Sequence, residues 1–205
     1  MVPQEYFDLY PLDNLPKVNL HPDEGHARHS WVEKQNVIMD SEAKFQDPEE
    51  RLRAMAAYYG LCTWLDHNVG QILKALDDAG FGNTTTVVYT SDNGDNVGAR
   101  GLWGKSNLYQ ESVSVPLIMA GPDVKQGLCS TPVSPLDISA TIPAHFGVTF
   151  DSDGRSLSDI AAQSDDPERA VLSEYHAAGA VSGAFMQRKG RTKPLARQWR
   201  LWLGF

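Results

Sequence analysis

The feature that most constrains the fold is a run of β-branched and aromatic residues that ends abruptly in oxygen-bearing side chains. The run Val87–Thr90 leads into the turn Asp92–Asp95. A glycine-flanked lysine, Lys105, comes next, and a second apolar run begins at Val115. Open α/β sheets present metal ligands and anion-binding cations at the carboxyl ends of their strands in this way. The pattern therefore predicts an α/β fold with a functional site at the sheet edge.

The turn places a carboxylate, Asp92, beside a carboxamide, Asn93. Two consecutive ligands at a strand end point apart unless the backbone turns, and Gly94 allows that turn. Oxygen ligands of this kind suit calcium or magnesium better than zinc. An Asp-Asn-Gly-Asp sequence alone is also typical of a structural turn. The apolar strand before it and the lysine loop after it favour a metal site.

Lys105 lies in a glycine-rich loop that also contains Trp103. Glycines let a backbone approach a ligand closely, and Trp103 would wall such a pocket. A lysine in this setting can hold a tetrahedral anion and stabilise charge on a leaving oxygen. The alternative interpretation of Lys105 is a solvated surface side chain.

Strand and helix patterns alternate along the chain, which predicts the α/β class. A long helix is expected over 47–80, with Asp47 as its N-cap and Gly80 just past its end. Residues 1–46, with prolines at 3, 11, 16 and 22, are expected to form an extended loop packed on the body. The expected strands are 84–90, 115–120 and 170–174, and further helices are expected over 107–112 and 134–146. Segment 84–90 is apolar enough to be a central strand of a parallel sheet.

Composition narrows the classes of partner. The net charge of −8 argues against nucleic-acid and anionic-membrane partners. It leaves an anionic substrate open, because one metal ion or lysine dominates the local field. No apolar run reaches the length of a membrane span, and two cysteines make no disulfide framework. No signal peptide is visible, so the sequence leaves the localisation open.

From about residue 58 to about residue 190 the chain resembles type I sulfatases, which belong to the alkaline phosphatase superfamily. The matching motifs occur in family order: the long helix, the metal-binding strand end, the sulfate-contacting lysine with the next strand, the segment before the following helix, and the start of a small C-terminal part. They are Tyr58–Leu73, Thr90–Gly94, Gly104–Ile118, Pro132–Ile138, Asp153–Leu157 and Ser173–His176.

The resemblance implies a partial alkaline-phosphatase-like sheet flanked by helices. Residues 1–148 would form the C-terminal portion of the sulfatase α/β domain, and residues 149–205 would begin a small C-terminal subdomain. Asp92 and Asn93 would bind calcium, with magnesium less favoured. Lys105 would contact the sulfate ester and stabilise the leaving group. The resemblance leaves open whether Trp103 and His176 also contact the substrate, and a structural hydrogen bond is the alternative for His176.

The nucleophile of this family is a formylglycine made from a Cys/Ser-x-Pro-x-Arg motif, and this motif is missing here. Neither Cys62 nor Cys129 lies in one, and the aspartate pair that supplies the family's other metal ligands has no counterpart. We therefore expect the C-terminal part of a sulfatase, with its formylglycine in a missing N-terminal part. Residues 192–205 depart from the family pattern, which suggests the hypothesis of a reading-frame shift near Arg191.

By resemblance, the parent reaction is hydrolysis of a sulfate ester, carried by a small molecule or by a sulfated glycan. Two alternatives remain at this stage. One is a phosphodiesterase or phosphonate monoester hydrolase of the same superfamily, and the other is a non-catalytic metal-binding remnant. The sequence does not select the ester that is cleaved.

Overall fold

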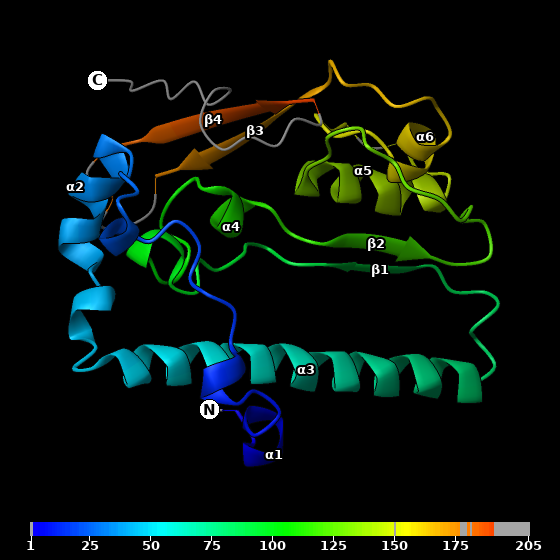
Figure 1. Cartoon of the computed structure of the whole chain (residues 1–205). Helices are drawn as coiled ribbons and strands as arrows, with labels where there is room; N and C mark the ends of the chain where they lie inside the picture. The colour runs from blue at the N-terminus through cyan, green and yellow to red at the C-terminus, as the bar shows by residue number, and fades with distance from the viewer. Residues whose placement is uncertain (1, 150, 177–179, 181, 191–205) are drawn as a thin grey trace. The chain divides into compact units, whose positions relative to one another are not determined.

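The chain divides into two compact units, Met1–Pro122 and Asp123–Phe205. The computed structural model describes residues 2–149, 151–176, 180 and 182–190 (Figure 1). The divergent tail 192–205 lies outside the described residues. The domain boundary that the motifs place after residue 148 stays a prediction, and the two compact units are described separately below.

The predicted long helix is present as α3 (Pro48–Asp78). Its first turn is capped because the Glu50 amide donates to Asp47 Oδ1 at 2.9 Å. Gly80, just past the end, has a φ of 78°, a conformation that glycine adopts without strain. The short helix α1 (Gln4–Phe7) packs on the middle of α3. The contact is close at Gly60, where a Cβ atom would lie 2.9 Å from the Tyr6 carbonyl oxygen.

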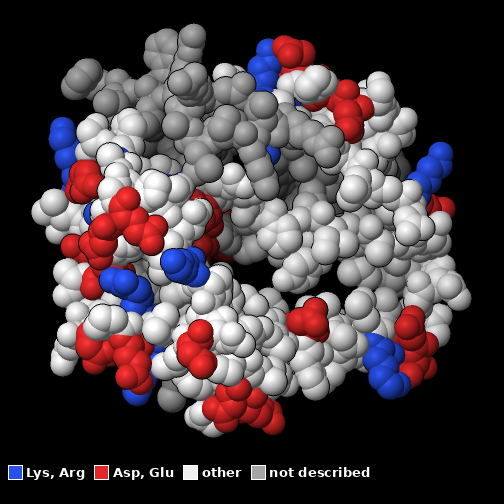
Figure 2. All heavy atoms as spheres, viewed as in Figure 1, with Lys and Arg blue, Asp and Glu red and all other residues white. Residues whose placement is uncertain are grey.

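The second half of α3 keeps large apolar side chains exposed. Leu61, Trp64, Leu65, Ile72 and Leu73 are 37% to 68% accessible. In Figure 2 acidic side chains gather over the lower part of the face, where α1 and α3 lie in Figure 1. The exposed surface of α3 therefore combines these apolar side chains with acidic ones and with basic ones paired to them, such as Lys74 with Asp78. Within the described residues, no helix combines the length and the apolar character that crossing a bilayer requires.

The expected extended loop over residues 1–46 is wrong where the structure forms helices. Besides α1, this segment contains three short 3₁₀ helices and the ten-residue helix α2 (Ser30–Met39). Two of these helices, η2 and α2, begin at histidine caps that the sequence analysis did not consider. The His29 ring accepts from the Trp31 amide at 3.1 Å, and the His21 ring accepts from the Asp23 amide at 3.3 Å. The 3₁₀ helices are η1 (Leu12–Asn14), η2 (Pro22–Glu24) and η3 (Glu42–Lys44).

The first unit contains a two-stranded sheet of β1 (Val87–Thr90) and β2 (Leu117–Ala120). Both predicted strands are present, but they pair antiparallel, with Val87 opposite Ala120. The expected parallel arrangement is therefore wrong for this pair. The connection between the strands holds only η4 (Ala99–Gly101) and α4 (Gln110–Val113). The connection, residues 91–116, is long enough for the crossover that a parallel pair needs, but it leads the chain back antiparallel to β1.

The second unit contains α5 (Pro135–His145), α6 (Leu157–Ala161), and the antiparallel strands β3 (Ala170–Tyr175) and β4 (Ala184–Lys189). The predicted helix after Ser134 is confirmed, and the structure adds a capping box formed by Ser134 and Asp137. The Asp137 side chain is completely buried. Its carboxylate accepts from the Ser134 amide at 2.8 Å, the Arg155 amide at 2.8 Å and Arg169 Nη2 at 2.7 Å. One carboxylate thus joins three segments of this unit.

The two glycines inside α3 should respond to alanine in opposite directions. Gly60→Ala should lower the free energy of unfolding by about 1–3 kcal/mol, because the new methyl group would overlap the Tyr6 carbonyl. Gly70→Ala should raise it by roughly 0.5–1 kcal/mol, because nothing lies within 4 Å and alanine favours the helix. Urea unfolding followed by circular dichroism measures both changes. Shifts of the same sign would contradict this account of helix packing.

Replacing the buried carboxylate of the second unit should be strongly destabilising. Asp137→Ala leaves the Arg169 guanidinium without its buried counter-charge, and such a loss costs about 3–5 kcal/mol. Asp123→Ala, at an exposed carboxylate, serves as the control and should change stability by less than about 0.5 kcal/mol. Chemical denaturation of both variants provides the comparison, and equal midpoints would exclude a structural role for Asp137.

Candidate metal and anion site

The predicted ligands and the predicted anion-binding lysine lie next to one another. Asp92 and Asn93 follow β1 directly, and Lys105 lies in the loop between η4 and α4. Lys105 Nζ lies 3.9 Å from Asp92 Oδ2, with the two side chains 57% and 83% exposed. An ion pair this exposed is weak. Both groups are therefore accessible to ions from solution at little cost.

The turn after β1 is fixed by a close backbone approach. The Gly94 amide donates to the Ser112 carbonyl at 2.8 Å. A Cβ atom on Gly94 would lie 2.0 Å from the Glu111 carbonyl oxygen, so no other residue fits. Its φ is outside the left-handed region. The glycine expected from the sequence is thus required by contact with the neighbouring segment.

Asp95 shapes the lysine loop. Its Oδ1 accepts from the Val97 amide at 2.8 Å and from the Gly104 amide at 3.1 Å. The next residue, Asn96, donates from Nδ2 to the Gly104 carbonyl at 2.5 Å. Both polar groups of Gly104 are therefore held directly before Lys105. Sequence reasoning missed this role, although an aspartate bonded two residues ahead is typical of an Asx turn.

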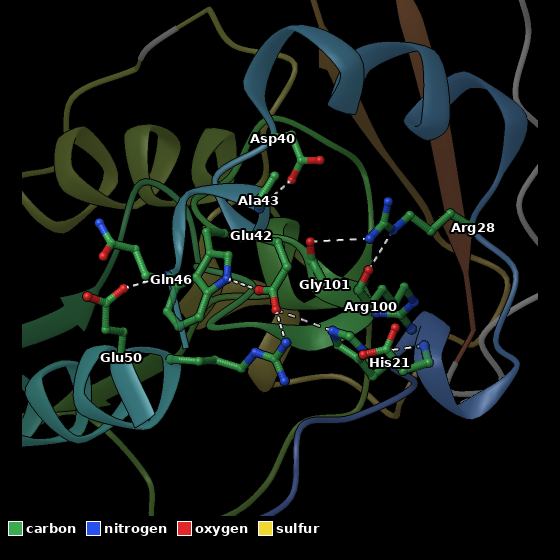
Figure 3. Close-up of polar contacts among 12 residues, drawn as sticks. His21, Arg28, Asp40, Glu42, Ala43, Gln46, Glu50, Arg100 and Gly101 are labelled. Carbon is green, nitrogen blue, oxygen red and sulfur yellow. Dashed lines mark hydrogen bonds and ion pairs between the residues drawn. The ribbon is translucent and has the colours of Figure 1, made fainter. Parts of the chain in front are cut away.

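Arg100 forms the base of the same loop and was not singled out from the sequence. It is 5% exposed and has a φ of 56°. Its Nη1 donates to Glu111 Oε2 at 2.7 Å, and its guanidinium lies 4.2 Å from the centre of the Tyr109 ring. Figure 3 shows Arg28 reaching the backbone here, with Nε 2.6 Å from the Arg100 carbonyl oxygen. Two arginines thus hold this loop: Arg100 through its bond to Glu111, and Arg28 through its bond to the Arg100 carbonyl.

The Glu42 carboxylate, labelled in Figure 3, joins Trp103 to an earlier part of the chain. Trp103 Nε1 donates to Glu42 Oε2 at 2.6 Å. Glu42 Oε1 forms an ion pair with Arg51 Nη2 and lies 3.5 Å from His21 Nε2. The Trp103 ring also contacts Phe45, with centroids 5.0 Å apart. The indole N–H is therefore used within the protein, and a substrate contact by Trp103 stays a prediction.

His176 follows β3 in the second unit, whereas Asp92, Asn93 and Lys105 belong to the first. Its Nε2 lies 3.3 Å from Glu174 Oε2, and its ring lies 4.8 Å from that of Phe185. These local contacts match the structural alternative. A substrate contact by His176 stays a prediction.

Within the described residues, no three His, Cys, Asp or Glu side chains converge as a metal site. Asp92 and Asn93 can supply two oxygen ligands, whereas calcium takes roughly six to eight. The pair therefore fits a hard cation only as part of a larger ligand set. Cys62 offers no activated nucleophile, since loss of hydration raises the pKa of its thiol.

The strand end thus carries a carboxylate and a carboxamide, with a lysine 3.9 Å from the carboxylate, as the motifs predicted. The fold mixes helices with small partial sheets, which is an α/β arrangement. A family model described as Sulfatase matches residues 19–148, so the chain belongs to the sulfatase family. The resemblance seen in the motifs is confirmed.

Known relatives support the same family. The chain is 31% identical to a choline-sulfatase of Rhizobium meliloti over 199 residues, covering 93% of this chain and 38% of that protein. It is 36% identical to arylsulfatase K of Danio rerio over 157 residues, covering 72% of this chain and 30% of that protein. The chain therefore spans well under half the length of these relatives.

A solved structure confirms the predicted fold class. The phosphonate monoester hydrolase of Silicibacter pomeroyi superposes with a TM-score of 0.79 and 25% identity, covering 91% of this chain and 43% of that one. The observed fold is a mixture of helices and small partial sheets, as the sequence predicted. Membership of the sulfatase family generally implies a metal ion and a formylglycine in the complete catalytic centre.

The Trp103 anchor should matter for stability far more than an exposed tryptophan does. Trp103→Phe removes the hydrogen bond to the Glu42 carboxylate, and a bond to a charged group contributes about 1.5–3 kcal/mol. Trp64→Phe, at a residue that is 42% exposed on α3, is the matched control and should have a small effect. Urea unfolding and hydrogen exchange at the Gly104 amide report the change. If the hydrogen-exchange rate of the Gly104 amide is unchanged in Trp103→Phe, Glu42 does not hold the loop.

Proposed function

We propose that this chain forms the cation-binding and sulfate-binding side of a sulfatase active site, whose parent reaction is hydrolysis of a sulfate ester. The observation that carries the proposal is the 3.9 Å separation of Lys105 Nζ and Asp92 Oδ2, at a strand end inside the family match. The Asp92 carboxylate and the Lys105 ammonium group are close together and both are exposed to solvent. Such a pair suits the joint binding of a cation and an anion.

Each side chain has a distinct part in this proposal. Asp92 and Asn93 would hold calcium, with magnesium less favoured, because their oxygens suit hard cations. When bound, the ion neutralises charge on the sulfate oxygens. Lys105 contacts the sulfate ester and stabilises the charge that develops on the leaving oxygen. The hydrogen bonds of Asp95 and Asn96 to Gly104 keep the backbone before Lys105 in place for that contact.

The chain would supply only part of the catalytic machinery. Its sequence contains no Cys/Ser-x-Pro-x-Arg motif, so the formylglycine of such an active site would come from residues outside it. Asp92 and Asn93 would likewise need further metal ligands. We therefore expect this chain alone to bind ions and to show no turnover.

The proposed substrate class is a sulfate ester of a small molecule or a sulfated glycan. The relatives named above include a choline-sulfatase and an arylsulfatase, so they do not select one ester. A phosphodiesterase or phosphonate monoester hydrolase is the second candidate, favoured by the structural likeness to such a hydrolase. The third candidate, a non-catalytic metal-binding remnant, would keep the cation site alone.

Calorimetric titration tests the proposal. Calcium chloride, then sodium sulfate or sodium phosphate, is added to the chain and to two variants. Lys105→Ala should weaken sulfate binding about tenfold, equivalent to roughly 1.4 kcal/mol, with calcium binding retained. Lys74→Ala, at a lysine whose side chain is 73% exposed on α3, should leave both affinities unchanged. Asp92→Asn should weaken calcium binding, because the ligand loses its charge.

The possible outcomes separate the three candidates. Sulfate binding that depends on Lys105 supports the sulfatase proposal. A clear preference for phosphate over sulfate would support the phosphate-ester alternative. Calcium binding without any anion binding would support the remnant, and equal effects of Lys105→Ala and Lys74→Ala would exclude Lys105 from the site.

A further inference from the structure

One buried serine bonds to both halves of the proposed ion site. Ser112 lies in α4 and is 2% exposed. Its backbone carbonyl accepts from the Gly94 amide at 2.8 Å. Its hydroxyl donates to the Lys105 carbonyl at 2.5 Å. The residue thus connects the turn that follows Asn93 with the residue that would contact the anion.

These two bonds hold the backbone while the functional side chains stay free. The Asp92 and Lys105 side chains are 83% and 57% exposed, so packing does not fix their positions. The position of each side chain is set by the backbone that carries it. The separation between the turn after β1 and the Lys105 loop therefore depends on backbone contacts, and Ser112 makes one contact to each of them.

The hydroxyl of Ser112 contributes something that the loop's own contacts do not. The Lys105 carbonyl also accepts from the Asn107 amide at 2.8 Å, but that bond lies within the loop and cannot fix its position. Asp95, in the turn, and Asn96, just after it, bond to Gly104 and so hold the residue before Lys105. The Ser112 hydroxyl instead joins Lys105 to α4, whose carbonyl at the same residue holds the turn.

We propose that Ser112 is a positioning residue for Lys105, and that it sets the separation between the cation-binding turn and the anion-binding lysine. This inference rests on the proposed function and deepens it. An anion that is shared between a cation and a lysine needs both at a fixed distance. A misplacement of about 1 Å can reduce the efficiency of such a site roughly a hundredfold.

The test uses variants of the full chain and sodium sulfate as the probe, titrated with calcium chloride in excess. Ser112→Ala should weaken sulfate binding about tenfold. Ser112→Thr, which keeps a hydroxyl, should recover most of the affinity. Ser114→Ala is the matched control, because Ser114 lies two residues further on and is exposed; it should bind sulfate as the unsubstituted chain does.

A double-mutant cycle separates positioning from a general structural effect. If Ser112 acts through Lys105, Ser112→Ala should change sulfate affinity less than twofold in a Lys105→Ala background. Thermal unfolding is measured alongside, and the loss of stability should be the same in both backgrounds. A merely structural role would instead weaken sulfate binding equally with and without Lys105, and would weaken calcium binding as well.

The outcomes for the two proposals can be told apart. If the unsubstituted chain binds sulfate through Lys105 and Ser112→Ala behaves like Ser114→Ala, the positioning role of Ser112 is overturned and the proposed function stands. If the unsubstituted chain binds no sulfate in the presence of calcium, the proposed function is overturned, and the role of Ser112 with it.

Discussion

The first unit depends most on the contacts that the Glu42 carboxylate makes with Trp103 and Arg51. The Glu42 side chain is only 14% exposed; Oε2 accepts a hydrogen bond from Trp103 Nε1, while Oε1 forms an ion pair with Arg51 and lies 3.5 Å from His21 Nε2. A largely buried carboxylate is costly unless donors compensate it, so Trp103 and Arg51 hold their segments against the one that carries Glu42. Because Trp103 comes two residues before Lys105, this network also fixes one end of the loop that carries the proposed site.

The second unit uses the same principle at Asp137. There a fully buried carboxylate receives two backbone amides and the Arg169 guanidinium. The difference lies in what is connected. Glu42 gathers side chains around a loop that ends in exposed functional groups, whereas Asp137 joins a helix start, a loop and the approach to a strand. The first network serves the proposed site, and the second serves the integrity of its own unit.

Local signals made much of this structure predictable. Asp47 with Pro48, and Ser134 with Pro135, mark helix starts through known helix-start chemistry, and the apolar runs mark β1 and β2. The histidine-capped helix α2 was missed because histidine is not among the usual capping residues. The antiparallel pairing was missed because an apolar strand does not reveal the direction of its neighbour. The proximity of Asp92 and Lys105 was predictable from motif order. The contact of Glu42 with Trp103 joins distant segments, and the contacts of Arg100 and Ser112 lie within a loop whose shape no local pattern encodes.

The close approach at Gly94 has a consequence for reading natural variation. A side chain there would meet the Glu111 carbonyl oxygen at 2.0 Å, as one at Gly154 would meet the Leu136 carbonyl oxygen at 2.1 Å. Both positions should therefore be glycine in every homologue that keeps this backbone. Position 94 adjoins the proposed ligands, so its invariance would look catalytic although its cause is steric. Position 154 is in the other unit and far from those ligands in the sequence. How invariant it is among homologues therefore shows how much invariance a steric constraint alone produces.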